Sequence, residues 1–375
     1  METFLREMTL QLRARGCHHV AVFSGQPSPT AVRYFEEIGL PFDVVPDILI
    51  DGWPSLKAID GILRRHRPEI LHFSFITLLG PTPWLARLRG VKRVFFTDQT
   101  SRLSLEVQKT PTWKRALARL LQIPVTGIMC VSGINRRMGV ERGVFPSNRT
   151  FVLYNGSELP PLDRFDEMRT SFRQRFNIPA DALVVAALCW MIPEKGIGDL
   201  IDAAPIVLRR VPNAHFLIGG IGPAWEEFKA QARRLGLDGH ITFTGLIENP
   251  LQDGVFPACD ILTQPSRWQE AFGWVISEAM GFERAVVATE VGGIPEVVDH
   301  GVTGLLCPHS KPEALAETLI TILVNPERRE QMGKAGRQRA KAKFELSSKV
   351  AELIGYYHLP PAARVPSAAA QPVPE

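Results

Sequence analysis

The sequence predicts an α/β protein with two domains, each built on a parallel sheet that helices cover on both faces. Short apolar strands alternate with amphipathic helices through the first half, which is the pattern of such sheets. The alternation restarts after a polar, proline-bearing segment at 157–165, which we interpret as a linker. With 375 residues, the chain is long enough for two domains that each bury a core.

The first half opens with a helix whose residues Phe4, Met8 and Leu12 share one apolar face, and Gly16 ends this helix. Apolar runs and turn residues place the elements that follow. The predicted order is a helix at 2–15, a strand at 20–23, a helix at 30–38, a strand at 42–45, a helix at 55–66, a strand at 70–73, a helix at 84–88, a strand at 94–96, a helix at 112–122, and strands at 128–132 and 151–154.

The second half repeats the pattern with longer apolar strands. We predict helices at 169–176, from about 198, from about 273, and at 311–323, 326–341 and 344–357, with strands at 183–188, 215–218 and 241–245. Residues 260–263 lead into the stretch 264–296, and residues 286–289 form a β-branched run. Residues 359–375 are rich in proline and alanine, and we predict that this tail is disordered. The predicted boundaries are a first domain at 1–156, a linker at 157–165, a second domain at 166–343, a helix at 344–358 and the tail.

The chain begins with a helix, whereas a doubly wound domain usually begins with a strand that becomes central. We therefore expect the first sheet to lack its central strand. A gap or a re-paired neighbour is expected between the strands near 20–23 and 70–73. On this hypothesis Met1 is an internal methionine of a longer protein.

Asp98 and Gln99 follow the strand at 94–96, at the edge where parallel sheets bind ligands, so both are candidates for contact with a ligand. His72 ends another strand, where either a packed histidine or a functional group fits. The glycine cluster at 219–222 suits either phosphate binding or close packing.

The helix at 112–122 is amphipathic, and two interpretations remain open. Its basic face suits a contact with a membrane surface, but it also suits a helix that faces the core and keeps a wet basic side. One face holds Trp113, Leu117, Leu120 and Leu121, and the other holds Lys114, Arg115 and Arg119.

Charge is unevenly spread along the chain. Residues 1–160 carry 21 Lys+Arg against 13 Asp+Glu, or +8, while residues 161–375 carry 22 against 26, or −4. A basic N-terminal half is a candidate for peripheral contact with an anionic membrane or an anionic acceptor, or it is a solvated face. No basic run is interleaved with aromatic residues, so nucleic acid is not an expected partner.

Cysteine usage and hydropathy bear on the compartment. The five cysteines are scattered and include no CxxC, which favours a reducing compartment over a disulfide or zinc framework. No apolar run approaches the roughly 20 residues that span a bilayer. A cytoplasmic location is therefore expected, with the inner face of the membrane as a candidate site of peripheral contact.

The stretch 264–296 carries the most chemistry. Glu270 follows a Pro-Ser turn, and a helix begins near Gly273, so its first N–H groups form an anion site. Glu278 lies roughly 8 Å further along that helix. Two carboxylates flanking an anion site suit a nucleotide sugar: the diphosphate lies on the helix start, and the carboxylates accept hydrogen bonds from sugar and ribose hydroxyls. The alternative is a solvated helix with two ordinary surface glutamates.

Lys195 lies on the loop between the strand at 183–188 and the next helix. A cation in this position can neutralise a diphosphate leaving group. No motif in the sequence has metal-ligand spacing, so no metal site is predicted.

The order of motifs resembles the donor domain of glycosyltransferase family 4. These motifs are Glu-x-Phe-Gly-x-x-x-x-Glu-Ala-Met from Glu270, then Val-Val-Ala-Thr, Gly-Gly-Ile-Pro-Glu-Val-Val and Gly-Val-Thr-Gly-Leu-Leu. The resemblance extends from Val184 to Leu306 and, more weakly, from Glu2 to Gly156. It implies the GT-B fold, in which two Rossmann-like domains face a cleft and a C-terminal helix crosses back to the first domain.

The resemblance also implies an activity, a retaining hexosyltransferase (EC 2.4) that uses a nucleotide diphosphate sugar as donor substrate and needs no cofactor or metal. Its acceptor would be a carbohydrate or a lipid-linked molecule, in the synthesis of a cell-surface polysaccharide or glycolipid. Rival interpretations are another GT-B enzyme, such as a phosphorylase or an epimerase, and a non-catalytic protein that binds nucleotide sugars.

Residue roles follow from the same resemblance. Glu278 would hold the ribose, Glu270 the donor sugar and Lys195 the diphosphate. The remaining donor-binding candidates are the Phe272, Gly273 and Trp274 backbone at the phosphates, Gly245 near the base, and Arg267.

Two positions depart from the family pattern. Trp190 stands where the family usually has an arginine, and Arg267 is the candidate substitute for it. Gln99 stands where the family often has a histidine that contacts the transferred sugar. The resemblance therefore makes Gln99 and Asp98 candidates for a sugar-contacting or acceptor-side role.

Overall fold

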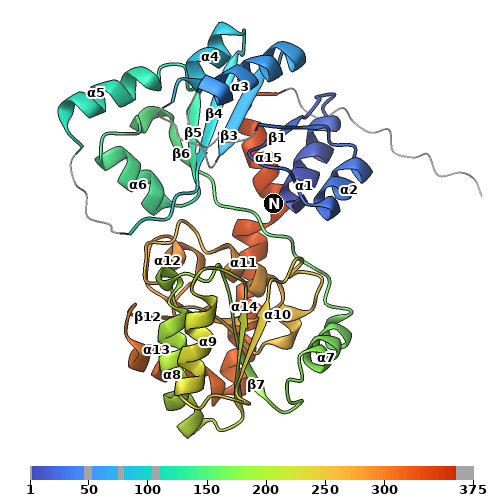
Figure 1. Ribbon diagram of the computed structural model, residues 1–375, viewed down its shortest axis with the longest axis vertical. Coiled ribbons are helices and arrows are strands. Elements are labelled where there is room, and N and C mark those ends of the chain that lie inside the picture. The colour runs from blue at the N-terminus through green and yellow to red at the C-terminus, as the bar shows by residue number, and fades with distance from the viewer. Residues whose placement is uncertain (1, 46–52, 75–79, 104–109, 360–375) are drawn as a thin grey trace, which may run out of the picture. The chain divides into compact units, whose positions relative to one another are not determined.

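The computed structural model describes residues 2–45, 53–74, 80–103 and 110–359. These residues form two compact units (Figure 1). Unit 1 comprises Met1–Phe95, Leu121–Gly127 and Ser347–Glu375, and unit 2 comprises Phe96–Leu120 and Ile128–Leu346. The domain boundaries expected at 156, 165 and 343 stay predictions. Of the tail predicted to be disordered, residues 360–375 lie outside the described residues.

The strands match the apolar runs of the sequence. They are β1 (Ala21–Phe23), β2 (Phe42–Val44), β3 (Ile70–Ser74), β4 (Arg93–Asp98), β5 (Gly127–Cys130), β6 (Thr150–Val152), β7 (Leu183–Leu188), β8 (Ala214–Gly219), β9 (Ile241–Gly245), β10 (Ile261–Gln264), β11 (Ala285–Thr289) and β12 (Gly304–Cys307). The pairs β1–β2, β5–β6, β7–β8, β8–β9, β7–β10, β10–β11 and β11–β12 are all parallel.

The helices include several that the sequence did not reveal, among them α6 and α9. They are α1 (Glu2–Arg13), α2 (Pro29–Glu37), α3 (Trp53–His66), α4 (Thr82–Leu88), α5 (Thr112–Leu121), α6 (Gly133–Glu141), α7 (Phe165–Arg175), α8 (Ile197–Arg210), α9 (Trp225–Arg234), α10 (Val255–Ala258), α11 (Trp274–Gly281), α12 (Ile294–Val297), α13 (Pro312–Leu323), α14 (Pro326–Phe344) and α15 (Leu346–Tyr356). Short 3₁₀ turns lie at Ser147–Arg149 and Pro193–Lys195.

The first half does not form one continuous sheet. β1 pairs with β2 in a two-stranded sheet, whereas β3 belongs to a four-stranded sheet of order β3-β4-β5-β6. Within the described part of the chain, β1 and β3 are therefore not hydrogen-bonded neighbours. The gap expected between these two strands is confirmed.

The second half contains a six-stranded sheet of order β12-β11-β10-β7-β8-β9. The chain enters at β7 and adds β8 and β9 on one side, then returns to β7 and adds β10, β11 and β12 on the other. The order therefore reverses between β7 and β10. In sheets of this kind, ligands bind beyond the carboxyl ends of the two strands that flank the reversal.

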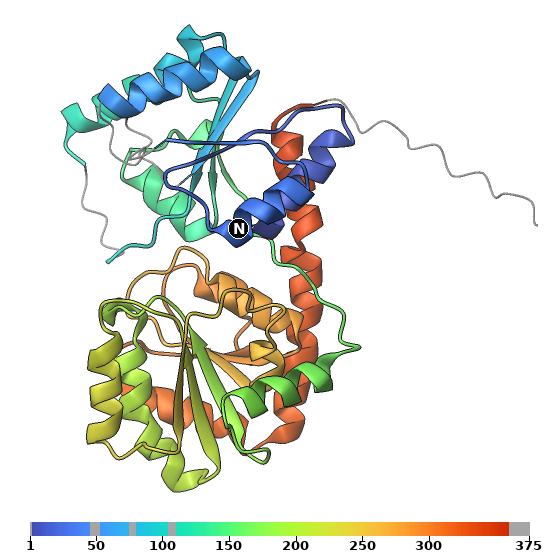
Figure 2. The same cartoon turned by 45° about the vertical axis from the view of Figure 1, so that its right-hand side comes forward.

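Two hydrophobic cores lie on the two faces of this sheet. Val185 and Ala187 of β7 pack into one core with residues of α8 and α13. Val184 and Ala186 pack into the other with residues of α10 and α11. Figure 2 shows the sheet between these helical layers. Because successive side chains of a strand point to opposite faces, the unbroken apolar run of β7 is what a strand buried on both faces requires.

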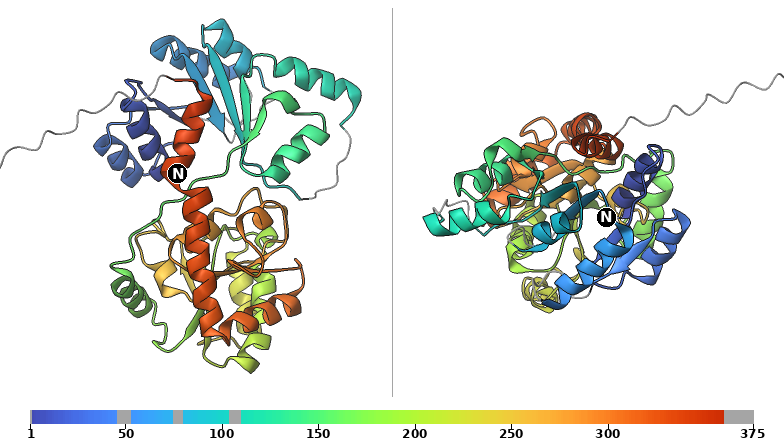
Figure 3. Two further views of the ribbon diagram at one scale, coloured as in Figure 1. Left: turned by 180° about the vertical axis from the view of Figure 1, so that it is seen from behind. Right: turned by 90° about the horizontal axis from the view of Figure 1, so that it is seen from above.

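In unit 1, α15 lies beside α1, as the left panel of Figure 3 shows, and Gln11 Nε2 donates to the Ser347 carbonyl at 2.9 Å. The His72 ring contacts the Tyr357 hydroxyl, and Tyr357 stacks against Phe95 at 5.0 Å between ring centroids. Burial lowers the pKa of His72 to about 4. The structure therefore supports the packed histidine of the two interpretations of His72.

The amphipathic helix α5 does not bury its apolar face. Trp113, Leu117 and Leu120 are all exposed, and the buried residue of the helix is Ala118. The core-facing interpretation of the apolar face is therefore wrong. Helical periodicity identified the stripe correctly, but it does not reveal which side of a helix meets the protein.

Candidate functional site

The candidate site lies where the order of the six-stranded sheet reverses. The loop after β7 carries Trp190 and Lys195, and the loop after β10 carries Arg267 and Glu270. Since β7 and β10 are parallel neighbours, both loops leave the same edge of the sheet. The topology thus brings together two segments that are about 75 residues apart in sequence.

Lys195 and Glu270 form a buried ion pair at this edge. Lys195 Nζ lies 2.7 Å from Glu270 Oε1, and the two side chains are 18% and 6% exposed. The same oxygen accepts hydrogen bonds from Ser266 Oγ at 2.6 Å and from Trp268 Nε1 at 2.7 Å. Lys195 Nζ also lies 4.9 Å from the centroid of the Trp268 ring, which adds a cation–π contact.

The surroundings of Glu270 keep its carboxylate ionised. Burial alone would raise the pKa of Glu270, but the charge of Lys195 and the hydrogen bonds from Lys195, Ser266 and Trp268 outweigh burial and lower it. Charge-assisted hydrogen bonds of this kind hold a carboxylate in one orientation. Glu270 is therefore a fixed negative charge beside a fixed positive one.

A segment that sequence reasoning missed completes the surroundings of Glu270. Ser101 Oγ donates to Glu270 Oε2 at 3.4 Å and accepts from the Ala271 N–H at 3.2 Å. Arg102 and Gln269 exchange backbone hydrogen bonds of 2.9 and 2.7 Å. The loop after β4 is thus joined to the Glu270 loop across more than 160 residues of sequence, and a single sequence carries no signal for such a contact.

Asp98 and Gln99 differ in their surroundings. Asp98 is buried, pairs with Arg102 Nη2 at 3.1 Å and accepts from the Thr100 N–H. Its contacts therefore fix the loop that presents Ser101. Gln99 is partly buried on the same loop, and its acceptor-side role stays a prediction.

The glycine pair of the Gly-Gly-Ile-Pro-Glu motif supports the Glu270 loop. Gly292 has φ +54°, and a Cβ built there would lie 2.1 Å from the Glu270 carbonyl oxygen. The Gly292 N–H donates to Gln269 Oε1, and the Gly293 N–H donates to the Glu270 carbonyl at 2.8 Å. Only glycine allows the two backbones to approach so closely.

A second glycine joins the Lys195 loop to the Glu270 loop. Gly196 has φ +71°, and a Cβ there would lie 1.9 Å from the Pro265 carbonyl oxygen. The Arg267 N–H also donates to the Glu194 carbonyl at 2.8 Å. The cluster at 219–222 packs in the same way, because a Cβ on Gly220 would lie 1.9 Å from the Cys189 carbonyl oxygen. This contact supports the packing interpretation of that cluster.

Arg267 points away from the Lys195–Glu270 pair. Its guanidinium forms two hydrogen bonds to Asp199 of α8, at 2.8 and 2.5 Å. Trp190 is 53% exposed at the start of the Lys195 loop. The Arg267 side chain thus ties the loop after β10 to α8. Its role as a substitute for the missing arginine stays a prediction.

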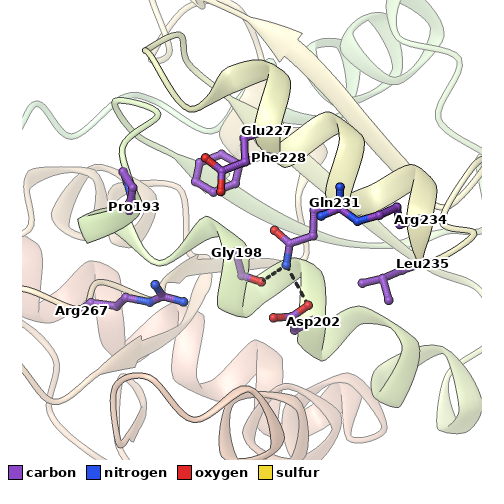
Figure 4. Close-up of a pocket in the computed structure, with 9 residues that line it drawn as sticks. All are labelled: Pro193, Gly198, Asp202, Glu227, Phe228, Gln231, Arg234, Leu235 and Arg267. Atoms are coloured by element: carbon purple, nitrogen blue, oxygen red, sulfur yellow. Dashed lines mark hydrogen bonds between the residues drawn. The ribbon is translucent and has the colours of Figure 1, made fainter.

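Arg267 also lines a pocket of about 390 Å³. Figure 4 shows Gln231 of α9 donating to the Gly198 carbonyl and to Asp202 of α8, with Arg267 at the rim. The lining residues are Pro193, Gly198, Asp202, Glu227, Phe228, Gln231, Arg234, Leu235 and Arg267. Neither Lys195 nor Glu270 lines this pocket, so it is not the candidate site.

The start of α11 combines backbone donors with an unpaired acceptor. Gly273 precedes the helix with φ +96°, a conformation that glycine adopts without strain. Gln264 Oε1 lies 3.3 Å from the position of a Cβ on Gly273, and it has no hydrogen-bond partner among the described residues. Sequence reasoning did not single out Gln264. A buried amide without a partner in the protein is suited to contact a ligand group.

The aromatic neighbours of Gly273 have different environments. Phe272 is buried, and its ring packs against Tyr154 and Phe344 at centroid distances of 6.1 and 5.4 Å. Its side chain is therefore part of the core, so that only its backbone can face a ligand. Trp274 is partly buried. Gly245 ends β9 with open space around its Cα.

Glu278 lies on α11 in surroundings unlike those of Glu270. Its side chain is partly buried, and burial, together with the charge of Glu158, raises its pKa to about 7. No ion pair or side-chain hydrogen bond to Glu278 is found in the described ranges. The pKa of Glu278 thus lies near neutral pH, and its carboxyl oxygens accept no hydrogen bond from a described residue.

The glutamate of the Gly-Gly-Ile-Pro-Glu motif caps a helix. Glu296 accepts from the backbone N–H groups of Gly133 and Ile134 at 2.7 and 2.9 Å, and from the Tyr154 hydroxyl at 3.0 Å. Burial and the charge of Glu296 raise the pKa of Tyr154 to about 12. A carboxylate at the N-terminus of α6 compensates the helix dipole.

Two features of the described residues bear on ligands and membranes. No group of three or more His, Cys, Asp or Glu side chains in the described ranges is arranged to hold a metal ion. Among the helices of the described part, none is both long enough and apolar enough to cross a bilayer.

Comparison with known proteins gives two family matches. Residues 1–159 match the family described as Glycosyltransferase Family 4, and residues 168–339 match the family described as Glycosyl transferases group 1.

Two curated relatives illustrate the sequence similarity. The D-inositol 3-phosphate glycosyltransferase of Corynebacterium efficiens is 36% identical over 49% of this chain and 45% of its own length. The GDP-mannose-dependent alpha-(1-6)-phosphatidylinositol monomannoside mannosyltransferase of Mycobacterium tuberculosis is 30% identical over 55% of this chain and 56% of its own length. The chain thus spans about half the length of these curated relatives.

Solved structures resemble the whole described chain. Anabaena Alr3699/HepE in complex with UDP and glucose has a TM-score of 0.77 at 19% identity, covering 95% of both chains. A glycosyltransferase from Rickettsia africae has a TM-score of 0.79 at 18% identity, covering 95% of this chain and 93% of its own. At such identities the likeness shows the fold, and it confirms the predicted α/β fold class. Together, the family matches and the solved structures support a glycosyltransferase of the GT-B fold, similar to the enzymes of glycosyltransferase family 4.

Proposed function

We propose that the chain transfers a hexosyl unit from a nucleotide diphosphate sugar to an acceptor hydroxyl, with retention of the anomeric configuration. The observation that carries the proposal is the Lys195–Glu270 pair, 2.7 Å apart at the reversal point of the six-stranded sheet. The start of α11 follows directly after Glu270 and supplies backbone donors. A cation, a carboxylate and a helix start in one place suit a diphosphate that is bonded to a sugar.

The roles follow from the charges. In the reaction, the bond from the anomeric carbon to the diphosphate oxygen breaks, a bond to the acceptor oxygen forms, and the proton of the acceptor hydroxyl passes to the departing diphosphate. Negative charge then grows on the departing diphosphate, where Lys195 stabilises it. Glu270 accepts from the sugar hydroxyls, and its existing bonds to Ser266 and Trp268 keep it oriented. Glu278 accepts from the ribose hydroxyls.

The acceptor and the metal requirement belong to the same proposal. We propose a carbohydrate or lipid-linked acceptor, used in building a cell-surface polysaccharide or glycolipid. Transfer is proposed to be independent of a bound metal, because Lys195 and the α11 start supply the positive charge that a metal ion supplies elsewhere. Turnover that survives a chelator is the expected result.

A thermal-shift screen across UDP-, GDP- and ADP-sugars tests donor binding, because a ligand that binds the folded state raises its stability. UDP-glucose and GDP-mannose come first. The Anabaena structure contains UDP and glucose, and the Mycobacterium relative is named for GDP-mannose. A shift with one base and none with the others identifies the donor class. No shift with any nucleotide sugar contradicts the proposal.

Glu270→Gln then separates catalysis from binding. We expect turnover to fall more than donor affinity, since the sugar that Glu270 contacts changes charge during transfer. Glu313→Gln, an exposed change on α13, is the matched control. Equal losses in turnover and binding, or no loss, would show that Glu270 is only a loop carboxylate. Dependence on inorganic phosphate would indicate a phosphorylase, acceptor-free conversion of the donor an epimerase, and binding without turnover a non-catalytic protein.

A further inference from the structure

The helix α5 presents an apolar face to solvent. Trp113, Leu117 and Leu120 are 64%, 46% and 53% exposed, which is unusual for three large apolar side chains on one short helix. They stand at positions i, i+4 and i+7, so they form one continuous stripe. Scattered exposed apolar residues need no explanation, but a contiguous stripe indicates a binding surface.

The helix is anchored by its opposite side. Ala118 is its buried residue, and Arg115 is partly buried with its guanidinium near Thr112 Oγ1. At about 100° per residue, Ala118 lies about 100° from Leu117, about 140° from Trp113 and about 160° from Leu120. The protein therefore holds α5 through one face and leaves the apolar face outward. Figure 1 labels the helix.

Charge on α5 is of one sign. Residues 112–121 contain Lys114, Arg115 and Arg119 and no acidic residue. The exposed Lys114 and Arg119 flank the apolar stripe on its two sides, and Lys114 Nζ lies 5.4 Å from the Trp113 ring centroid. An apolar stripe bordered by cations is the pattern of a helix that lies in a membrane interface, where tryptophan is also favoured.

We propose that α5 docks on an anionic lipid surface. The helix lies in the plane of the interface, with Trp113, Leu117 and Leu120 at the boundary between headgroups and acyl chains. Lys114 and Arg119 then contact anionic headgroups. A second copy of the chain is disfavoured as the occupant, because two α5 faces would bring four cations together, Lys114 and Arg119 from each copy. This proposal does not depend on sugar transfer.

Co-sedimentation of the full chain with lipid vesicles tests the proposal. The probe is an equimolar mixture of phosphatidylglycerol and phosphatidylcholine, compared with phosphatidylcholine alone. We expect binding to the anionic vesicles that weakens as salt is raised. The variant Trp113→Ser/Leu117→Ser/Leu120→Ser should lower the partition coefficient at least about tenfold. Lys114→Gln/Arg119→Gln should lower it roughly 30-fold at low salt.

Matched controls change exposed residues of the same types elsewhere. Leu88→Ser and Val324→Ser remove exposed apolar side chains, and Lys341→Gln/Lys343→Gln removes two exposed cations. These variants should bind like the unchanged chain. Because all the changed residues are exposed, circular dichroism should show an unchanged fold for every variant.

Three outcomes would overturn the proposal. One is no binding to anionic vesicles, or equal binding to neutral ones. Another is equal loss of binding in the α5 variants and their controls. The third is a dimer in analytical ultracentrifugation that Leu117→Ser dissociates, together with no vesicle binding, because the stripe would then join two copies. Donor binding in the thermal-shift screen is read separately, so a failure here leaves the proposed transferase activity testable.

Discussion

Glu270 and Glu278 are separated by seven residues, yet the structure treats the two carboxylates in opposite ways. Glu270 lies on a loop where Lys195, Ser266 and Trp268 converge on one of its oxygens, and its pKa is lowered. Glu278 lies in the apolar helix α11, and burial raises its pKa to about 7. The first carboxylate has several partners in the protein, while the second has no hydrogen-bond partner among the described residues.

This difference shows that the spacing of a motif does not determine the chemistry of its members. Both residues are glutamates beside the same helix start. What separates them is the number of hydrogen-bond donors around each carboxylate. Glu270 receives donors from its own loop and from the loops after β4 and β7, whereas Glu278 receives none from the described residues. Ionising a buried carboxylate without hydrogen-bond partners costs free energy, and hydrogen bonds from the hydroxyl groups of a bound ligand would offset that cost.

The largest expected effect comes from removing the partner of Glu270. Lys195→Met leaves a buried carboxylate without its cation, so we expect the free energy of unfolding to fall by about 3–5 kcal/mol. Chemical denaturation measures it. The control Lys229→Met breaks the exposed pair with Glu226 and should cost less than about 1 kcal/mol. The double variant Lys195→Met/Glu270→Gln should regain part of the loss. A loss no larger than that of the control would mean that the pair is not electrostatically important.

Glu278→Ala probes the other side of the comparison. Removing an acceptor of ribose hydroxyls should weaken donor binding by about 1.5–3 kcal/mol, the usual worth of a hydrogen bond to a charged group. Isothermal titration with the donor found in the screen measures it. The fold should stay intact, because no described residue depends on this carboxylate for a hydrogen bond. Unchanged donor affinity in a folded variant would show that the ribose assignment is wrong.

The two glutamates should also give opposite pH dependences. A carboxyl group whose pKa is raised on folding stabilises the fold below its unfolded pKa, and this stabilisation is lost as pH rises through the folded pKa. For Glu278 the window runs from 4.5 to about 7.

The variant Glu278→Gln should therefore match the unchanged chain near pH 4 and exceed its free energy of unfolding by about 1–3 kcal/mol near pH 8. Glu270, with its lowered pKa, contributes stability above its unfolded pKa that is lost as pH falls. Urea titrations across this range measure both. A pH-independent difference for Glu278→Gln would mean that Glu278 is not buried as described.

The smallest effect is expected at Trp190. Trp190→Arg restores the cation that the family usually has on this loop, and we expect donor affinity to stay the same or rise by up to about 1 kcal/mol. Titration with the same donor measures this. Since Trp190 is 53% exposed, the change leaves no cavity in the core. A large loss of affinity would mean that the indole itself contacts the donor.

The alternation of strands and helices could be predicted because apolar periodicity is a local property. Lys195 and Glu270 could be placed on loops for the same reason. Their direct ion pair could not, because the contact depends on the parallel pairing of β7 with β10. Ser101 escaped notice because its partner lies 169 positions away.

The direction of a side chain or of a helix face was equally inaccessible. From the sequence, Arg267 could contact either the Lys195–Glu270 pair or α8. In the structure it bonds to Asp199 of α8. The stripe of α5 was recognised, but the choice between core and solvent depended on which segment packs against Ala118. Local patterns specify that a surface exists, and long-range packing specifies what it faces.

The close approach of Gly292 to the Glu270 carbonyl has a consequence for tracing descent among related chains. A lineage that lost catalysis but kept its folded loops would still be selected for this glycine, since any side chain would collide with backbone. The glycine pair is therefore a marker of shared architecture. On the proposed function, loss of sugar binding in such a descendant would show first at Glu278, because no described residue depends on this carboxylate for a hydrogen bond and it is therefore freer to change.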